Sequence, residues 1–306
     1  MIEKYYSRGK LLLTAEYLVL QGAQALAIPV NLGQSIEITP ANSGQINWLT
    51  KEQEYVVFSA NFSLLDFSVL SSSNNEKSGY ISNLLKAVRL LSPSFLGKSK
   101  GCEVIAYIEF NMQWGLGTSS TLINNLAQWA NVNPFELNSL VSKGSGYDIA
   151  CASATTPILY QVTDNKPISK PVVFQPPFLK NLTLVYLNKK MATENNITSF
   201  LKNSIALQSK INEVNVLTHK FIECTLLDSF VDLLIDHENL IASILQQTPV
   251  KQLLFSDFDG AIKSLGAWGG DFILAASENN FERQRNYFNN KGYTTVIPLK
   301  EFIELK

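Results

Sequence analysis

The chain is poor in the residues that build disulfides, metal sites and nucleic-acid surfaces. Its 306 residues include three cysteines and two histidines, and 25 Lys+Arg nearly balance 26 Asp+Glu. An odd, widely spaced set of cysteines argues against a disulfide framework and favours a reducing cytoplasm. We interpret His219 and His237 as ordinary histidines and not as metal ligands. The net charge of −1 gives no basic field for nucleic acid, so an anionic ligand must be met by local donors.

Long apolar runs are also missing. No stretch approaches the roughly 18 uninterrupted apolar residues that a membrane helix needs. The first apolar segment is broken by Thr14, Glu16 and Tyr17, which argues against a signal peptide. With 46% hydrophobic and 17% charged residues, the chain is typical of a globular protein. We expect a soluble, cytoplasmic monomer or homodimer that binds a small molecule, with no nucleic-acid or membrane partner.

Hydrophobic periodicity predicts an α+β protein with two domains. β-branched and aromatic residues predict strands at 10–20, 26–38 and 53–70, and a helical stripe follows at 79–91. Period-2 alternation predicts a strand over 102–110, and the Asn- and Ser-rich stretch 71–78 favours a loop. Further strands are predicted at 182–187, 271–276 and 295–298, with helices between 195 and 250. A proline-bearing change of texture past residue 165 predicts domains 1–165 and 166–306.

The sharpest local feature is the glycine loop at residues 114–120, Trp-Gly-Leu-Gly-Thr-Ser-Ser, between a predicted strand and a predicted helix. Glycines let a backbone approach a ligand, and the N-terminus of the next helix offers N–H groups to an anion. The loop has no Gly-Lys-Ser/Thr ending and is not a Walker A loop. Two interpretations stay open for the loop alone: phosphate binding, or a tight turn with Thr118 or Ser119 as helix N-cap.

Two segments supply candidate charges. Lys10 opens an apolar strand, where it either binds phosphate or is a solvated strand-end lysine. Glu16 lies in an apolar run, so it either faces solvent or is a buried acid with a partner. Asp148 follows Gly144-Ser145-Gly146-Tyr147 at an expected helix start. There it either complements the helix dipole or accepts a proton from a substrate hydroxyl.

Taken together, these segments resemble the motifs of the GHMP kinases, the family of galactokinase, homoserine kinase, mevalonate kinase and phosphomevalonate kinase. Residues 8–17 are similar to the first motif, 115–120 to the nucleotide loop and 266–272 to the third motif. The matches occur in the family's order and span nearly the whole chain, which makes the set far more specific than any single motif.

The resemblance implies an N-terminal domain like the second domain of ribosomal protein S5, a ferredoxin-like C-terminal domain, and ATP and Mg²⁺ as cofactors. It implies Asp148 as catalytic base, Lys10 as the lysine that activates the acceptor, and Ser119 as a Mg²⁺ ligand. The implied ATP-binding residues are Gly115, Leu116, Gly117, Thr118, Ser119 and Ser120. The implied substrate-binding residues are Glu16, Tyr17, Gly144, Ser145, Gly146, Tyr147, Gly266, Trp268, Gly269 and Gly270.

The segment at 144–150 looks most like mevalonate and phosphomevalonate kinases, and the Glu16-Tyr17 pair leans toward the latter. Trp268 and Asp271 depart from the family, since relatives carry glycine there, and they could narrow the site or change the acceptor. Trp114, just before the loop, favours core packing over stacking on a base.

Three functions are compatible with these features: an active small-molecule kinase, including a sugar or amino-alcohol kinase, a protein of this fold that binds ligand without turnover, and an ATP-dependent decarboxylase. The decarboxylase is disfavoured by the kinase-like form of the segment at 144–148.

Overall fold

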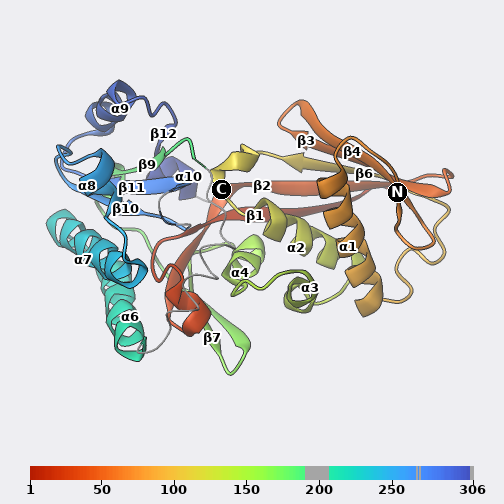
Figure 1. Ribbon diagram of the computed structural model, residues 1–306, viewed down its shortest axis with the longest axis horizontal. Coiled ribbons are helices and arrows are strands. Elements are labelled where there is room, and N and C mark those ends of the chain that lie inside the picture. Colours follow the sequence, from red (N-terminus) through yellow and green to blue (C-terminus); the bar gives the residue numbers. More distant parts are fainter. Residues whose placement is uncertain (190–206, 267, 269, 304–306) are drawn as a thin grey trace. The chain divides into compact units, whose positions relative to one another are not determined.

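The computed structural model describes residues 1–189, 207–266, 268 and 270–303 (Figure 1). The chain divides into two units, each assembled from several segments. The first unit comprises Met1–Gly9, Leu32–Met112 and Leu116–Ser153, and the second comprises Lys10–Asn31, Gln113–Gly115 and Ala154–Lys306. Strands β1 (Glu3–Leu12) and β2 (Ala25–Pro40) pair with each other, and each contributes residues to both units. Among the described residues, no helix is long and apolar enough to cross a membrane.

The first unit contains a mixed sheet in the order β5-β4-β3-β6-β2. Its strands, besides the C-terminal part of β2, are β3 (Gln45–Glu52), β4 (Tyr55–Ser63), β5 (Val69–Ser72) and β6 (Cys102–Ile108). The pairing of β3 with β6 is parallel and the other pairings are antiparallel. In β6 alternate residues from Cys102 to Ile108 are buried, as expected for a strand with one face on a core.

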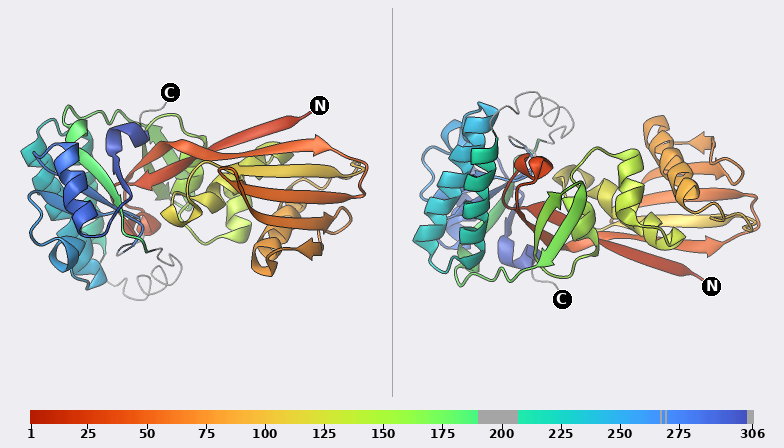
Figure 2. Two further views of the ribbon diagram at one scale, coloured as in Figure 1. Left: turned by 90° about the horizontal axis from the view of Figure 1, so that it is seen from above. Right: turned by 90° about the horizontal axis from the view of Figure 1, so that it is seen from below.

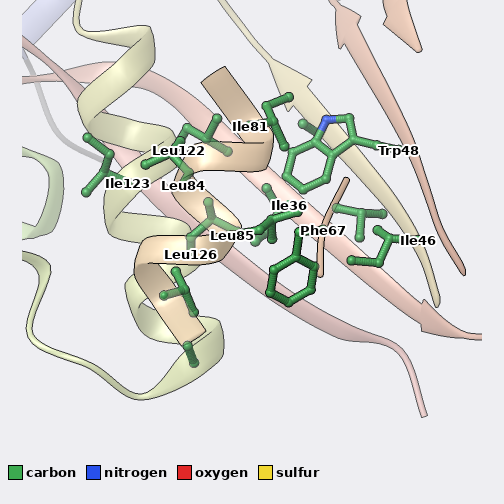
Figure 3. Close-up of a cluster of buried hydrophobic side chains, with 14 of the residues drawn as sticks. Ile36, Ile46, Trp48, Phe67, Ile81, Leu84, Leu85, Leu122, Ile123 and Leu126 are labelled. Atoms are coloured by element: carbon green, nitrogen blue, oxygen red, sulfur yellow. The ribbon is translucent and has the colours of Figure 1, made fainter. Parts of the chain in front are cut away.

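Helices supply the other half of this core. They are α1 (Asn75–Leu91), α2 (Thr118–Ala130), α3 (Pro134–Val141) and α4 (Tyr147–Ser153). The α1 helix starts at a cap, because the Asn74 side chain accepts a hydrogen bond from the Lys77 amide at 3.0 Å. Its buried stripe and that of α2 face the strands, where Leu84, Leu85 and Leu126 meet Ile36 and Phe67 (Figure 3).

The second unit contains an antiparallel sheet in the order β10-β11-β9-β12. Its strands are β9 (Leu182–Tyr186), β10 (Ala261–Ser264), β11 (Phe272–Ala276) and β12 (Val296–Pro298). The helices of this unit are α6 (Gln208–Glu223), α7 (Leu227–Leu245), α8 (Val250–Leu254), α9 (Phe281–Asn290) and α10 (Leu299–Ile303). Helices α6 and α7 lie side by side, and α7 packs on β10 (Figure 2). Every residue of β9, β10 and β11 is buried.

This unit also contains the N-terminal part of β2, which pairs with β7 (Ile158–Thr163), and β7 pairs with β8 (Lys166–Pro171). Both pairings are antiparallel. Three short 3-10 helices complete the described chain, at Leu18–Gln21, Met112–Trp114 and Leu179–Asn181.

The predicted helix at 79–91 and the strands at 102–110, 182–187 and 271–276 are confirmed within a few residues. The predicted loop at 71–78 is wrong, since β5 ends at Ser72 and capped α1 starts at Asn75. Strands β3, β7 and β8 were not predicted. The division into a nucleotide-binding domain at 1–165 and a C-terminal domain at 166–306 stays a prediction.

The core on α1 gives a direct test of stability. Leu85 is fully buried and Leu90, on the same helix, is 70% exposed. We expect Leu85→Ala to lower the free energy of unfolding by about 2–5 kcal/mol, because it removes buried methyl groups and leaves a cavity. Leu90→Ala is the matched control and should change it by less than about 0.5 kcal/mol. Urea denaturation followed by circular dichroism measures both, and equal losses would contradict this core.

Candidate active site

The glycine loop has the backbone of an anion-binding turn. Gly115 has φ +67° and Gly117 has φ +91°, the left-handed region that glycine enters without strain. Gly117 is the N-cap of α2 and makes no side-chain cap, so the predicted cap by Thr118 or Ser119 is wrong. The first amides of a helix have no acceptor within it. Here, where the cap residue has no side chain, those amides can bind an anion.

Small side chains line the start of α2. The Ser120 hydroxyl donates to the Gly117 carbonyl at 2.8 Å, and Thr121 donates to Gln34 Oε1 at 2.6 Å. Leu116 is buried, whereas Ser119 is exposed. Ser119 is therefore accessible in the first turn of α2.

The residues just before the loop are held within the second unit. The Tyr186 hydroxyl donates to the Gln113 carbonyl at 3.0 Å. The Trp114 ring packs edge-on against Phe272, with centroids 5.7 Å apart, and lies 6.4 Å from the Phe302 ring. These ring contacts agree with the core-packing interpretation of Trp114.

Lys10 contacts the glycine loop directly. It is half-buried on β1, and its ammonium donates to the Gly115 carbonyl at 2.8 Å. The alternative of a fully solvated strand-end lysine is therefore wrong. The structure brings together two residues that are 105 positions apart and that belong to two different sequence motifs.

Asp271 stands against the same glycine. A Cβ built on Gly115 would lie 2.4 Å from Asp271 Oδ2. A side chain at position 115 would therefore have to displace the Asp271 carboxylate. Asp271 itself has φ +52°, so it takes the backbone conformation for which glycine is the usual residue.

Ser119 and Asp148 share a neighbour in the first unit that was not predicted, Tyr80 of α1. Its side chain hydrogen-bonds Ser119. Burial raises the pKa of Tyr80 and the Asp148 charge raises it further, while the Ser119 bond lowers it. Only a weak signal pointed to Tyr80 in advance, since it lies inside the predicted helix at 79–91 but outside its buried stripe.

The loop before Asp148 forms a tight entry to α4. Gly146 is buried with φ +85°, and its carbonyl accepts the Ala150 amide at 3.0 Å. Gly144 is exposed, while Ser145 and Tyr147 are half-buried. Asp148 is half-buried in the first turn, where its carboxylate accepts the Ile149 amide at 3.0 Å. The dipole interpretation and the catalytic interpretation both fit this placement.

Glu16 belongs to a buried charged cluster in the second unit. Its carboxylate pairs with the ammonium of Lys263, and neither side chain has exposed surface. The neighbouring His237 Nε2 accepts the Ala15 amide at 3.0 Å, and Glu238 accepts the amide and hydroxyl of Ser264 at 3.0 Å each. Of the two interpretations of Glu16, the buried acid with a partner is confirmed. Its assignment to substrate binding stays a prediction.

This cluster holds a turn with unusual backbone angles. Ala15 has φ 63° and Tyr17 has φ 61°, both left-handed, which costs an L-residue about 1–2 kcal/mol each. Burial raises the pKa of Glu16 to about 7, against the lowering effect of Lys263. Burial, and then the Lys263 charge, lower the pKa of His237 well below its usual range. A neutral His237 ring agrees with its role as acceptor of the Ala15 amide.

The third motif lies beside this turn. Gly266 has φ +64°, and the buried Trp268 donates its backbone amide to the Tyr17 hydroxyl at 3.2 Å. Gly270 is also buried. Gly269 lies outside the described residues.

Comparison with known proteins defines the fold. No protein-family model matches the sequence, and no curated protein matches it. Solved structures do. The chain is similar to the Methanococcus jannaschii mevalonate kinase at 15% identity over 97% of each chain, with a TM-score of 0.68. It is similar to the Streptococcus pneumoniae phosphomevalonate kinase, solved with phosphomevalonate and AMPPNP, at 17% identity over 95% of this chain and 97% of that one, with a TM-score of 0.70.

A third likeness is to the Lactococcus lactis galactokinase complexed with galactose, at 14% identity over 95% of this chain and 88% of that one, with a TM-score of 0.64. These neighbours are GHMP-family kinases, and the chain has their two-domain α+β fold. The prediction of an S5-like domain with a ferredoxin-like domain is confirmed at the level of fold. The identities are too low to carry substrate or activity from these proteins to this one.

The Lys263 ion pair predicts a pH-dependent loss of stability. Glu16 has a pKa of about 7 when folded and an ordinary value of 4.5, so between these pH values the folded state holds a proton that the unfolded state has released. The contribution of Glu16 to stability therefore falls as pH rises through that window, and the lowered His237 pKa acts with the opposite sign. Lys263 lowers the pKa of Glu16, Glu238 and His237 alike, so its removal raises all three.

We expect Lys263→Met to lower the free energy of unfolding by about 3–5 kcal/mol at pH 8, where it leaves a buried carboxylate unpaired. The loss should be smaller at pH 5.5, because the raised pKa values let these groups hold protons. Urea denaturation at the two pH values measures it. Lys210→Met, which removes an exposed ion pair with Glu213, is the control and should have little effect at either pH. Equal losses at both pH values for Lys263→Met would contradict the role of this cluster.

The Gly115–Asp271 contact predicts non-additive substitutions. Gly115→Ala should destabilise the protein by about 1–2 kcal/mol through its left-handed backbone, and by more through the Cβ contact with Asp271. In an Asp271→Gly background, Gly115→Ala no longer has the Cβ contact and keeps only the backbone cost. The double variant should therefore lose less stability than the sum of the two single losses. Denaturation of the four proteins closes the cycle, and strict additivity would exclude the contact.

Proposed function

We propose that this protein is an ATP-dependent small-molecule kinase of the GHMP type. It transfers the γ-phosphoryl group to a hydroxyl or phosphate acceptor, with mevalonate- or phosphomevalonate-like acceptors favoured. The observation that supports this best is the Lys10 ammonium on the Gly115 carbonyl, at 2.8 Å, at the start of a glycine loop that opens a helix. It joins a cation to a phosphate-binding backbone, and phosphoryl transfer needs little beyond positioning and charge stabilisation.

The nucleotide phosphates bind the loop at 115–120. The backbone amides at the start of α2 point at them, and Lys10 neutralises charge that develops during transfer. The left-handed glycines keep Cβ atoms away from this backbone. In this proposal residues 1–165 carry the nucleotide site and residues 166–306 form the C-terminal domain.

Asp148 accepts the proton of the acceptor hydroxyl. The hydroxyl oxygen forms a bond to the γ-phosphorus, the bond from that phosphorus to the β–γ bridging oxygen breaks, and ADP leaves. Asp148 is half-buried in the first turn of α4, a position that the helix dipole favours for a carboxylate. The neighbouring segment 144–147, in the same unit as Asp148, positions the acceptor.

The residues present fit a Mg²⁺ ion delivered with ATP. Among the described residues no group of three or more His, Cys, Asp or Glu side chains could hold a metal alone. Mg²⁺ in such sites keeps several waters and takes few protein ligands besides the phosphates. A loop serine hydroxyl is one such ligand in other nucleotide-binding enzymes, and the exposed Ser119 offers one here. When bound, Mg²⁺ would neutralise phosphate charge. Tyr80 fixes the Ser119 side chain through its hydrogen bond.

The acceptor preference rests on motif likeness and on the neighbours. The mevalonate and phosphomevalonate kinases share this fold with the galactokinase, so the fold alone does not choose the acceptor. A sugar or an amino alcohol is the alternative acceptor class. A second function, ligand binding with little or no turnover, is favoured by one observation: a carboxylate, Asp271, stands against the phosphate loop at Gly115. The proposal includes a cytoplasmic location and a monomer or homodimer.

An assay of ADP release separates these functions. The purified chain is incubated with MgATP and mevalonate, phosphomevalonate, homoserine or galactose, and acceptor-dependent ADP is measured. ATP binding without ADP release on any acceptor would favour the binding protein. We expect Asp148→Asn to lower kcat by about 10²–10⁴-fold with folding intact, since the proton acceptor is lost.

The control for this change is Asp66→Asn, an exposed aspartate of the same unit that should leave kcat unchanged. Turnover of Asp148→Asn at the wild-type rate would remove Asp148 from the mechanism and leave the kinase assignment to the acceptor assay.

A further inference from the structure

A network of buried polar side chains connects α2 with β1 and β2 inside the first unit. The Asn125 side chain donates to the Gln34 carbonyl at 2.9 Å and accepts the Ser7 hydroxyl at 2.7 Å, and Asn124 donates to the same hydroxyl at 2.8 Å. Closer to the glycine loop, the Thr121 hydroxyl donates to Gln34 Oε1 at 2.6 Å. All of these residues are buried. Hydrogen bonds fix distances and directions that apolar packing leaves free, so the network defines how α2 lies on the two strands.

Thr121 is the member of this network that reaches the glycine loop. Its backbone amide donates to the Gly117 carbonyl at 3.0 Å, while its hydroxyl is bound to Gln34. The hydroxyl oxygen also lies 3.0 Å from the Thr118 carbonyl and 3.1 Å from the Gly117 carbonyl. A hydroxyl has one proton to donate, and Gln34 Oε1 is the nearest of these acceptors. One residue therefore ties the Gly117 carbonyl to strand β2.

The Gly117 carbonyl belongs to the same peptide unit as the Thr118 amide. In a trans peptide these two groups point in opposite directions. The carbonyl points into the helix, where it accepts the Thr121 amide and, at 2.8 Å, the buried Ser120 hydroxyl. The Thr118 amide therefore points out of the N-terminus of α2, where the proposed function places a nucleotide phosphate.

Gly117 does not hold this peptide unit in place by itself. It is the N-cap of α2 with φ 91° and ψ 40°, and it makes no side-chain cap. Glycine enters this left-handed conformation without strain, but it also has the widest choice of other conformations. The direction of the Thr118 amide therefore depends on the hydrogen bonds that the Gly117 carbonyl accepts.

We propose that Thr121, held by Gln34, is a positioning residue for the nucleotide. It fixes the Gly117–Thr118 peptide so that the Thr118 amide can donate to a phosphate oxygen. Thr121 has no exposed surface, so it acts through this peptide and not by contact with the ligand. The inference rests on the proposed kinase function and adds to it two residues outside the loop at 115–120.

Two variants of Thr121 separate positioning from packing. Thr121→Val keeps the shape of the side chain and removes the hydroxyl, whereas Thr121→Ser keeps the hydroxyl. Binding of a non-hydrolysable ATP analogue with Mg²⁺ to the full chain is measured by calorimetry. We expect Thr121→Val to raise the dissociation constant about 3–10-fold, the effect of one hydrogen bond, and Thr121→Ser to stay within about twofold of wild type.

Gln34→Leu removes the other partner of the same hydrogen bond. It should weaken binding of the analogue by a similar factor, and it carries the test if Thr121→Val does not fold. The double variant should bind no more weakly than either single variant, because both changes remove one interaction. Losses that multiply in the double variant would mean that the two residues act independently and would overturn the pair.

Ser82→Ala is the matched control for lost stability. Ser82 is a buried residue of α1, in the same unit, and its hydroxyl donates to the Phe67 carbonyl at 2.6 Å. Its loss should destabilise the protein in urea denaturation, as the loss of the Thr121 hydroxyl should, but leave the affinity for the analogue unchanged. An equal rise of the dissociation constant in Ser82→Ala would overturn a positioning role specific to Thr121.

The positioning role and the kinase function fail separately. Weaker binding of the analogue by Thr121→Val, without ADP release from any acceptor, would support the positioning role and overturn the kinase. ADP release with an unchanged dissociation constant in Thr121→Val would overturn the positioning role and keep the kinase. In an active enzyme the change should fall on KM for ATP, and a change confined to KM for the acceptor would also overturn the positioning role. A wild-type protein that does not bind the analogue would overturn both.

Discussion

The hydrogen bond from Lys10 to the Gly115 carbonyl is the interaction on which the candidate site depends. It places an ammonium group beside the glycine loop. Because the acceptor is a backbone carbonyl, the position of the Lys10 side chain depends on the backbone conformation of Gly115. The first amides of α2, which follow this residue, have no acceptor within the helix, and that suits an anion. Asp271, the residue just before β11, lies against the same glycine, so Gly115 has a positive and a negative side chain beside it.

The sequence allowed prediction of the elements whose pattern is local and periodic. Helix α1 has its buried leucines at helical spacing, and β6 alternates with period two. The loop at 71–78 was mispredicted because its polar residues include the cap of α1, Asn74, and a cap looks like a loop in composition. Strand β8 was missed because all its residues are exposed, which removes the hydrophobic signal.

Pairings across long separations could not be predicted at all. Lys263 is itself buried in the four-residue strand β10, and its partner, Glu16, is 247 positions away. A buried Glu16 was expected to have a partner, but no local pattern identified which residue it was. The same limit applies to Tyr80 beside Ser119, since no periodic pattern marks a contact between a helix and a distant loop. The motifs marked the candidate residues, and only the fold defines their neighbours.

The cluster around Glu16 has a consequence for the order of events during synthesis. The turn at Ala15 is held by His237, 222 positions later, and Glu16 is neutralised by Lys263. While the ribosome has made only the first two hundred residues, this turn lacks both its acceptor and its counter-ion. Contacts of such high sequence separation form late and slow the folding of a chain. The turn at Ala15–Tyr17 therefore reaches its final structure only after helix α7 and strand β10 have been synthesised. A chain truncated before α7 lacks both residues that stabilise this turn.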